Sequence, residues 1–488
     1  MNKSSDERPN ILLICVDHWS GLFTRPAGHQ VVMAPTIAQI ARNGVNFSRA
    51  YSACPVCIPA RRTLLTGQTS RSHGDRIFNE YLEMPDPEEV PTLPQTLKQS
   101  GYQAHAVGKL HVYPQRDRIG FDEVILNEEG RHHLADMTDD WELYLAEQGY
   151  PGQEYAAGMC NNDYLTRSWH LPDHCHPTNW AAAQMCRTIC RRDPRKPAFW
   201  YLSFIGPHPP VWPLQAYMDV YRDVELDERV YGYWCPSFED LPYGPKCYMD
   251  QFAMRHAFRH EVDLGRRAFY ANITHIDHQI RVVIGTLREQ GLLDNTILAF
   301  TSDHGEMLGD HHMWAKGVMY EKSARVPLIV VPPSKDDRLT PGSSDDRLVE
   351  LQDIMPTLLD LCGVDVPSTV DGSSLLQGQR RPHLYGEYAE DEEATRMICE
   401  DRFKLIYYPV GNVFQLFDVQ ADPLEQRNLA GGKEHREAQQ RLTDLLVQHL
   451  YGSDLEWVKD RELVGLPDRV FEPRLNRSLS GQRGWRFI

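Results

Sequence analysis

Continuous apolar runs, rather than alternating ones, mark three of the strands expected in the first 300 residues. These runs lie at residues 11–16 (ILLICV), 198–205 (AFWYLSFI) and 296–301 (TILAFT), and a further, short strand is expected at residues 103–107. Continuous runs of this length are typical of strands buried on both faces of a parallel sheet. Between them, apolar residues at helical spacing predict helices at residues 35–44, 92–101 and 269–289. The alternation of strands and helices predicts an α/β fold with a mostly parallel central sheet flanked by helices.

Each of these four strands is followed by polar side chains that can carry chemistry. In chain order they are Asp17 with His18, Lys109 with His111, His208, and Asp303 with His304. In open α/β sheets, ligands bind beyond the carboxyl ends of the strands. We therefore expect these side chains to converge on one site. The alternative is that these polar residues are unrelated to one another and are simply buried or on the surface. That hypothesis does not explain why every such strand ends in this way.

The pattern changes from residue 381 onward. Residues 404–408 (KLIYY) and 413–417 (VFQLF) predict strands of a small antiparallel sheet, closed by a helix at about 434–451. We expect a catalytic domain at 1–378, a C-terminal subdomain at 379–454 and a tail at 455–488. The Arg-rich tail has no core of its own, which predicts an oligomerisation arm or, alternatively, disorder.

Two long stretches, residues 127–180 and 211–263, lack clear periodicity and are rich in Trp, Tyr, His and Pro. Loops of this kind beside a sheet edge often shape a substrate pocket. Surface excursions packed by their own aromatic side chains are an equal alternative.

Composition narrows the class of protein and of partner. A chain of 488 residues that is 41% hydrophobic and 24% charged is typical of a globular protein with a large core. Its formal net charge of −17 argues against nonspecific nucleic-acid and anionic-membrane partners. Neither a targeting segment nor a run of transmembrane length is present, and eleven cysteines without a leader predict reduced thiols and a cytoplasmic location.

Residues 51–67 (YSACPVCIPARRTLLTG) hold Cys57, Pro59 and Arg61 in a CxPxR arrangement. Pro59 predicts a helix that starts just after Cys57 and ends at Gly67. Cys57 would then face unpaired backbone N–H groups, which is an anion site. Two alternatives stay open: a buried structural cysteine, or a metal or redox pair with Cys54, although no second CxxC exists.

The CxPxR arrangement, with the leucines and Gly67 that follow it, resembles the signature of the sulfatase family within the alkaline phosphatase superfamily. In that family the cysteine is oxidised to formylglycine, whose hydrate is the nucleophile. Ala60 stands where serine is commoner, but the modification needs only the cysteine, proline and arginine. Residues 416–430 (LFDVQADPLEQRNLA) are similar to the family's C-terminal subdomain, so the resemblance spans nearly the whole chain outside the tail.

The resemblance implies a divalent metal ion bound by Asp17, Cys57 after modification, Asp303 and His304. Hard carboxylates and an imidazole suit such an ion. Many sulfatases have aspartate where His18 stands and asparagine where His304 stands. These departures admit manganese beside calcium, the first expectation, and are similar to the choline sulfatase and phosphonate monoester hydrolase branches.

The basic residues expected around the sulfate in the family match Lys109, His111, His208 and Lys316. Cations there would offset charge on the sulfuryl oxygens. We expect Arg61 to hold the formylglycine hydroxyl, His208 to protonate the leaving oxygen and His111 to assist the aldehyde hydrate. His18 and Asn79 are expected to make secondary contacts with substrate oxygens.

The predicted function is hydrolysis of a small-molecule, aryl or saccharide sulfate monoester. One hydroxyl of the hydrate would attack sulfur, and loss of a proton from the other would expel sulfate and regenerate the aldehyde. A phosphonate monoester or phosphodiester hydrolase is the alternative, although the GKxH pattern of Lys109 and His111 favours a sulfatase. A third hypothesis is an inactive relative or an unmodified thiol protein. A formylglycine-generating or maturase enzyme is an expected partner, and a homo-oligomer the expected assembly.

Overall fold

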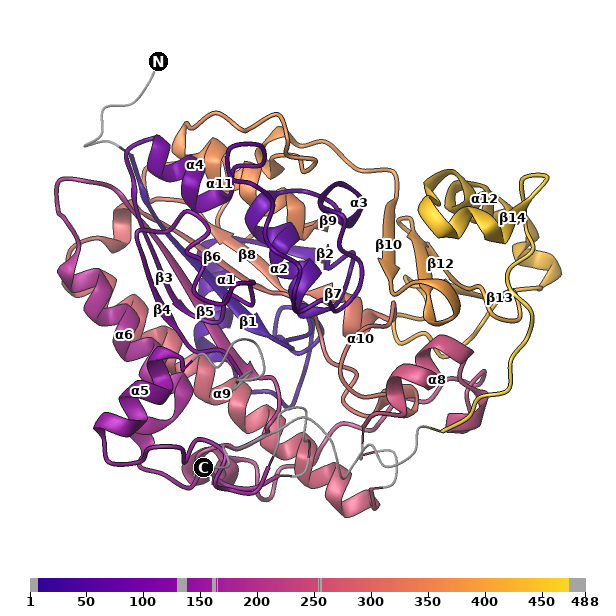
Figure 1. The fold of residues 1–488 in the computed structure, drawn as a ribbon, viewed down its shortest axis with the longest axis horizontal. Coiled ribbons are helices and arrows are strands. Elements are labelled where there is room, and N and C mark those ends of the chain that lie inside the picture. Colours follow the sequence, from indigo (N-terminus) through magenta and orange to yellow (C-terminus); the bar gives the residue numbers. More distant parts are fainter. Residues whose placement is uncertain are drawn as a thin grey trace.

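The computed structural model describes residues 8–129, 138–159, 164, 166–252, 254 and 257–473. A nine-stranded sheet with helices on both faces forms the larger part, and a four-stranded antiparallel sheet stands beside it (Figure 1). The predicted α/β fold with a smaller antiparallel unit is confirmed. Among the helices described, none combines the length and the apolar character needed to cross a membrane.

Four neighbouring parallel strands form the centre of the large sheet. In spatial order they are β3 Gln103–Gly108, β5 Ala198–Pro207, β1 Asn10–Asp17 and β6 Thr296–Ser302. These are the four strands predicted from the sequence. Since all four are parallel, their carboxyl ends lie at the same edge of the sheet.

Further strands extend the sheet on both sides. On one side β4 Glu123–Leu126 pairs with β3 in parallel. On the other side lie β8 Leu328–Val331, β2 Val45–Tyr51, β7 Arg325–Val326 and β9 Ser344–Glu350. Within this group only the β2–β9 pairing is parallel, so the sheet is mixed but mostly parallel.

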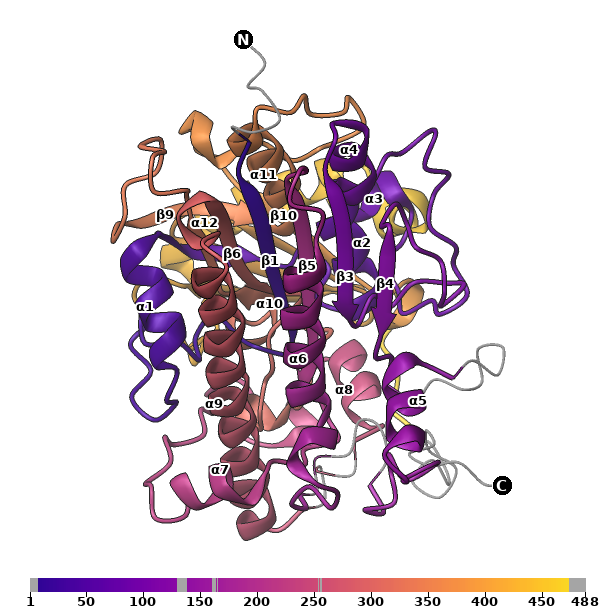
Figure 2. The same ribbon diagram turned by 90° about the vertical axis from the view of Figure 1, so that its left-hand side faces the viewer.

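Strand β1 contributes side chains to two separate hydrophobic cores. Ile11 and Leu13 pack on the face that carries α2 Cys57–Thr66 and α11 Ile354–Cys362. Leu12 and Ile14 pack on the opposite face, which is crossed by α6 Pro177–Arg191 and α9 Arg259–Glu289 (Figure 2). Successive side chains of a strand point to opposite faces, so a strand covered on both sides reads as a continuous apolar run. Full burial of each such side chain contributes about 1.5–3 kcal/mol.

The α-helices of the described residues are α1 Pro35–Asn43, α2 Cys57–Thr66, α3 Ser70–His73, α4 Leu93–Gln99, α5 Asp140–Glu147, α6 Pro177–Arg191, α7 Gln215–Val220, α8 Tyr243–Met249, α9 Arg259–Glu289, α10 Glu321–Ala324, α11 Ile354–Cys362 and α12 Arg436–His449. Helix α9 starts well before the predicted residue 269. Its first turn is capped by the Glu261 carboxylate, which accepts from the Phe258 backbone N–H at 2.7 Å.

The C-terminal sheet has the order β10 Leu384–Tyr388, β11 Thr395–Cys399, β12 Phe403–Tyr408 and β13 Val413–Asp418. Strands β12 and β13 and helix α12 were expected from the sequence. A small hairpin, β14 Val458–Lys459 with β15 Glu462–Leu463, follows. Trp457, which is 1% exposed, packs with leucines of α12, so the start of the predicted tail contributes to this core. Residues 474–488, which include Trp485 and Phe487, lie outside the described residues.

A buried carboxylate, Asp454, joins the C-terminal unit to the segment after α3. Both its oxygens accept from Arg396, at 2.7 Å each, and Oδ2 also accepts from Arg76 at 3.0 Å. Arg396 and Asp454 are fully buried. Removing one member of such a group leaves an uncompensated buried charge.

We therefore expect Asp454→Ala to destabilise the protein by about 3 kcal/mol, measured by urea-induced unfolding. Asp401→Ala is the matched control because Asp401 forms an ion pair with Arg49 at 3.0 Å while its side chain is 63% exposed. An exposed pair contributes less than about 1 kcal/mol. Equal losses in the two variants would contradict the structural role assigned to Asp454.

Candidate active site

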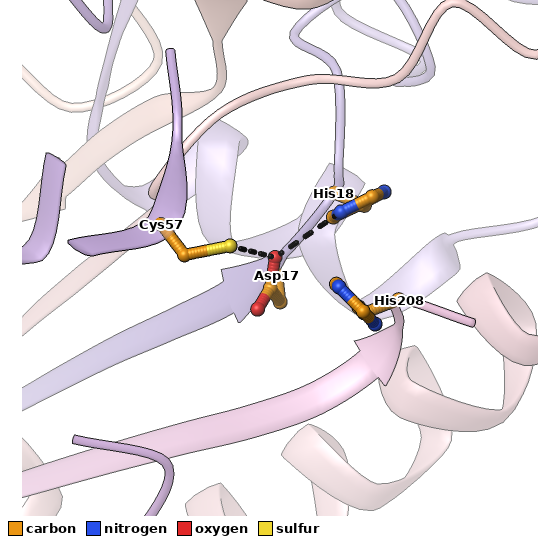
Figure 3. A group of neighbouring side chains, drawn as sticks. All are labelled: Asp17, His18, Cys57 and His208. Atoms are coloured by element: carbon orange, nitrogen blue, oxygen red, sulfur yellow. Dashed lines mark hydrogen bonds and ion pairs between the residues drawn. The ribbon is translucent and has the colours of Figure 1, made fainter. Parts of the chain in front are cut away.

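The polar residues after the four central strands come together at one edge of the sheet. Figure 3 shows Asp17 at the end of β1, between Cys57 on one side and the His18 and His208 rings on the other. The four side chains are 4% exposed or less. The convergence expected from the strand ends is therefore present, and it lies inside the protein rather than on its surface.

Cys57 is the first residue of α2, which ends at Gly67 in the left-handed conformation. Its Sγ lies 3.1 Å from His304 Nε2 and 3.7 Å from Asp17 Oδ1. Burial, aided by the Asp17 carboxylate, raises the pKa of the Cys57 thiol to about 11. The unmodified side chain is therefore a protonated thiol near neutral pH, which is a poor nucleophile.

Asp17, Cys57, Asp303 and His304 offer ligand atoms that all lie within 4.8 Å of one another. These are the four residues expected to bind metal. His304 Nδ1 lies 3.0 Å from the Gly305 carbonyl, which assigns the ring proton to Nδ1 and leaves the Nε2 lone pair facing the cluster. Burial lowers the pKa of His304, so the ring is neutral, as a metal ligand must be. Two buried carboxylates and a neutral imidazole fit a divalent cation.

Two cations compensate the buried carboxylates. Arg61 Nε donates to Asp303 Oδ2 at 2.8 Å, and its Nη1 donates to the Lys109 carbonyl at 2.9 Å and to Ser203 Oγ at 2.7 Å. The Lys109 ammonium contacts Asp17 Oδ2 directly. Although burial acts to raise it, the pKa of Asp17 is held well below its usual range, mainly by Lys109. Asp17 is therefore ionised in the folded protein.

Lys316 lies between two histidines. Its Nζ is 2.6 Å from His18 Nε2 and 3.1 Å from His208 Nε2. Burial, with the Lys316 charge, lowers the pKa of both rings well below the usual range. The other nitrogen of His208, Nδ1, lies 2.5 Å from the Pro209 carbonyl. Both rings are thus neutral and accept hydrogen bonds from the ammonium.

His18 has no nitrogen left for a further partner, since Nδ1 lies 2.8 Å from Glu306 Oε2. Its predicted contact with substrate oxygens stays a prediction. The His111 ring packs edge-on against the Phe78 ring, with 5.6 Å between the ring centroids. The backbone N–H of His111 donates to Glu128 Oε1 at 2.8 Å. The contact described for the Asn79 side chain is local: it accepts from the Tyr81 N–H at 3.2 Å.

Two carboxylates at the site were not expected from the sequence. Glu306 is fully buried two residues after His304, and the only sequence signal is its place next to the Asp303 and His304 pair. Glu129 contacts the Lys109 ammonium and lies 3.7 Å from His208 Nε2. It follows β4, a short strand that the sequence pattern did not reveal.

The aperiodic stretches contribute Trp141, Tyr155 and Trp212 to a cavity of about 20 Å³ beside His208. Part of each stretch therefore lies beside the site, which is the position expected of loops that shape a substrate pocket.

The chain is similar to known proteins over nearly its whole length. The model of the sulfatase family matches residues 9–364, and a model described as N-sulphoglucosamine sulphohydrolase, C-terminal, matches residues 309–451. An arylsulfatase of Clostridium perfringens is 33% identical over 479 residues, covering 94% of this chain and 97% of the relative. A choline-sulfatase of Rhizobium meliloti is 28% identical, covering 87% of this chain and 82% of the relative.

Solved structures support the fold. A phosphonate monoester hydrolase from Silicibacter pomeroyi has a TM-score of 0.75 at 24% identity, covering 91% of this chain and 95% of its own. A protein solved in complex with its substrate D-glucosamine-2-N,6-O-disulfate has a TM-score of 0.71 at 22% identity, covering 90% and 97%. At these identities the likeness extends to the fold and no further.

Proposed function

Because the chain belongs to the sulfatase family, we propose that it hydrolyses a sulfate monoester to an alcohol and inorganic sulfate, with Cys57 as the precursor of the nucleophile. The observation that carries this proposal is the position of Cys57. Its Sγ lies at the start of α2 and within 4.8 Å of the ligand atoms of Asp17, Asp303 and His304.

Oxidation of Cys57 to formylglycine would supply, in the hydrated form, the hydroxyl that bonds to sulfur. Asp17, Asp303 and His304, with residue 57, would hold one divalent metal ion, calcium or manganese. Such an ion supplies charge compensation and activates a hydroxyl at neutral pH. Arg61 orients Asp303 through its 2.8 Å hydrogen bond.

Lys109 and Lys316 supply positive charge to the sulfuryl oxygens. A chain with a net charge of −17 needs such a local basic pocket to bind an anion. Preorganised cations in a site closed to water stabilise charge more strongly than the same groups do in solution. Both lysines are buried, at 0% and 6% exposure respectively.

His208 is the proposed proton donor to the leaving oxygen. With its Nδ1 proton donated to the Pro209 carbonyl, Nε2 is the nitrogen that can exchange a proton. Nε2 carries no proton in the neutral ring and lies 3.1 Å from Lys316 Nζ, so it can take a proton from the ammonium and pass it to the leaving oxygen. His111 would accept the proton from the second hydroxyl of the hydrate, which expels sulfate.

The proposed substrate is a small-molecule, aryl or saccharide sulfate ester. The arylsulfatase and choline-sulfatase relatives support a sulfate ester, and the structure solved with a disulfated glucosamine supports a saccharide. The second candidate, a phosphonate monoester hydrolase, is favoured by one observation: the likeness of the fold to an enzyme of that name.

The decisive comparison is kcat/KM for an aryl sulfate against the matched aryl phosphonate monoester. We expect the sulfate to be preferred by more than about tenfold, a difference of about 1.4 kcal/mol in barrier. The protein should be coproduced with a formylglycine-generating enzyme, and mass spectrometry should verify the oxidation of Cys57. A tenfold preference for the phosphonate would transfer the assignment to the second candidate.

Further proposals concern partners and organisation. We propose a formylglycine-generating or maturase enzyme as partner and a cytoplasmic location, the latter because the buried Cys54 and Cys57 are free thiols and form no disulfide. The domain limits at 378 and 454 and an oligomerisation arm at 455–488 stay predictions. So does the absence of nucleic-acid and membrane partners, which rests on the net charge.

A further inference from the structure

Glu306 is a fully buried carboxylate that receives four hydrogen bonds. Oε1 accepts from the backbone N–H groups of Leu308, at 2.8 Å, and Ala315, at 2.6 Å. Oε2 lies 2.5 Å from the Tyr164 hydroxyl and 2.8 Å from His18 Nδ1. The proposed reaction gives Glu306 no task, yet it contacts a side chain at the centre of the site.

The second nitrogen of His18 determines which partner donates. His18 Nε2 lies 2.6 Å from Lys316 Nζ, and an ammonium group can only donate. In a neutral ring, Nε2 is then the acceptor and the proton resides on Nδ1, which points to Glu306. His18 also adopts the left-handed conformation, with φ of 69°, and its ring lies 4.3 Å from that of His208.

We propose that Glu306 is a positioning residue that fixes the Nδ1–H tautomer of His18 and thereby holds Lys316 against His208. The contacts form a chain from the carboxylate through His18 Nδ1 and Nε2 to Lys316 Nζ and on to His208 Nε2. The same carboxylate also binds the N–H of Ala315, the residue before Lys316, so it sets both the backbone and the ammonium of this lysine. This inference rests on the proposed sulfate-ester hydrolysis, in which Lys316 and His208 act together.

Glutamine at position 306 would separate this role from simple packing. An amide has one accepting oxygen, and the two rigid backbone N–H groups require it. The amide NH₂ would then face His18 Nδ1 and convert it to an acceptor. The ring proton would move to Nε2 and point at the Lys316 ammonium, which displaces the lysine.

The test is a double-mutant cycle of Glu306→Gln and His18→Asn, with kcat/KM for an aryl sulfate as the readout. Asparagine suits position 18 because it tolerates the left-handed backbone and has no tautomers. We expect Glu306→Gln to lower kcat/KM about 100-fold in the native background and less than about threefold beside His18→Asn. Equal losses in both backgrounds would mean that Glu306 only holds the backbone at Leu308 and Ala315. That result would overturn the proposal.

Tyr164→Phe is the matched control, since it removes another donor to Oε2 and leaves the carboxylate and His18 in place. We expect it to lower kcat/KM less than about threefold. A loss as large as that of Glu306→Gln would also contradict the proposal, because it would trace the effect to the hydrogen-bond network and not to the tautomer.

A second measurement needs only the native protein. Nitrogen NMR of ¹⁵N-histidine-labelled protein distinguishes the protonated from the unprotonated ring nitrogen, and His18→Asn identifies the His18 signals by their loss. We expect the proton on Nδ1; a proton on Nε2 would overturn the inference even if Glu306→Gln fails to fold. The tautomer does not depend on turnover, so failure of the proposed sulfatase activity would be seen separately.

Discussion

Replacement of Cys57 by alanine or serine is expected to abolish turnover, lowering kcat for an aryl sulfate at least about 10⁴-fold, or more than about 5 kcal/mol in barrier. Alanine removes the precursor of the nucleophile. Serine supplies one hydroxyl but not the second, whose deprotonation would expel sulfate. We therefore expect the serine variant to stop at a stable sulfate ester, visible as an added mass on the intact protein.

The unmodified thiol cannot replace the aldehyde hydrate. Burial and Asp17 raise the pKa of Cys57 to about 11, so the thiolate is scarce near neutral pH. The control is Cys54→Ala, because Cys54 is the other buried cysteine of the CxxC sequence. Near-native activity is expected there. A loss equal to that of the Cys57 variants would favour a metal or redox pair, and full turnover without Cys57 would exclude the mechanism.

His208→Gln is expected to lower kcat/KM by an amount that depends on the leaving group. For an alkyl sulfate, whose alkoxide is a poor leaving group, we expect a loss of about 10³-fold, within the usual range for general acid catalysis. For a nitrophenyl sulfate, whose phenolate departs without a proton, we expect about tenfold. The measurement is kcat/KM over a series of sulfate esters of rising alcohol pKa, in the native protein and in the variant.

The control for this series is His275→Gln. His275 is also a buried histidine, on α9, and its Nε2 lies 2.6 Å from Asn179 Oδ1. Any loss there should be the same for every ester, because it acts through packing. A uniform loss in His208→Gln would contradict its role as proton donor and leave Lys316 to protonate the leaving oxygen directly.

The local sequence was sufficient to locate the elements that carry the chemistry. The three continuous apolar runs became β1, β5 and β6, because a strand buried on both faces has no polar alternation to interrupt it, and the short strand expected at residues 103–107 became β3. The end of α2 followed from Gly67, which adopts the left-handed conformation that glycine tolerates. The start of α2 differs by one residue from the prediction, since Cys57 itself is helical.

Other features depend on contacts that no local pattern records. Strands β2, β4 and β7–β9 are short or mixed in polarity, and their pairing with distant segments makes them strands. Helix α9 begins at Arg259 through a cap formed by Glu261, before the apolar period starts. Glu129 lies after one of the unpredicted strands, so its contact with Lys109 could not be anticipated.

The sequence by itself determined the class of fold, the family and the residue types at the strand ends. The tertiary structure decided that β3, β5, β1 and β6 are neighbours, which brings residues nearly 300 positions apart in the chain into one cluster. It also decided the partners within that cluster, such as Glu306 beside His18 and Lys316 between two imidazoles. A side chain's type is local information, whereas its proton, charge and orientation depend on the groups that surround it after burial.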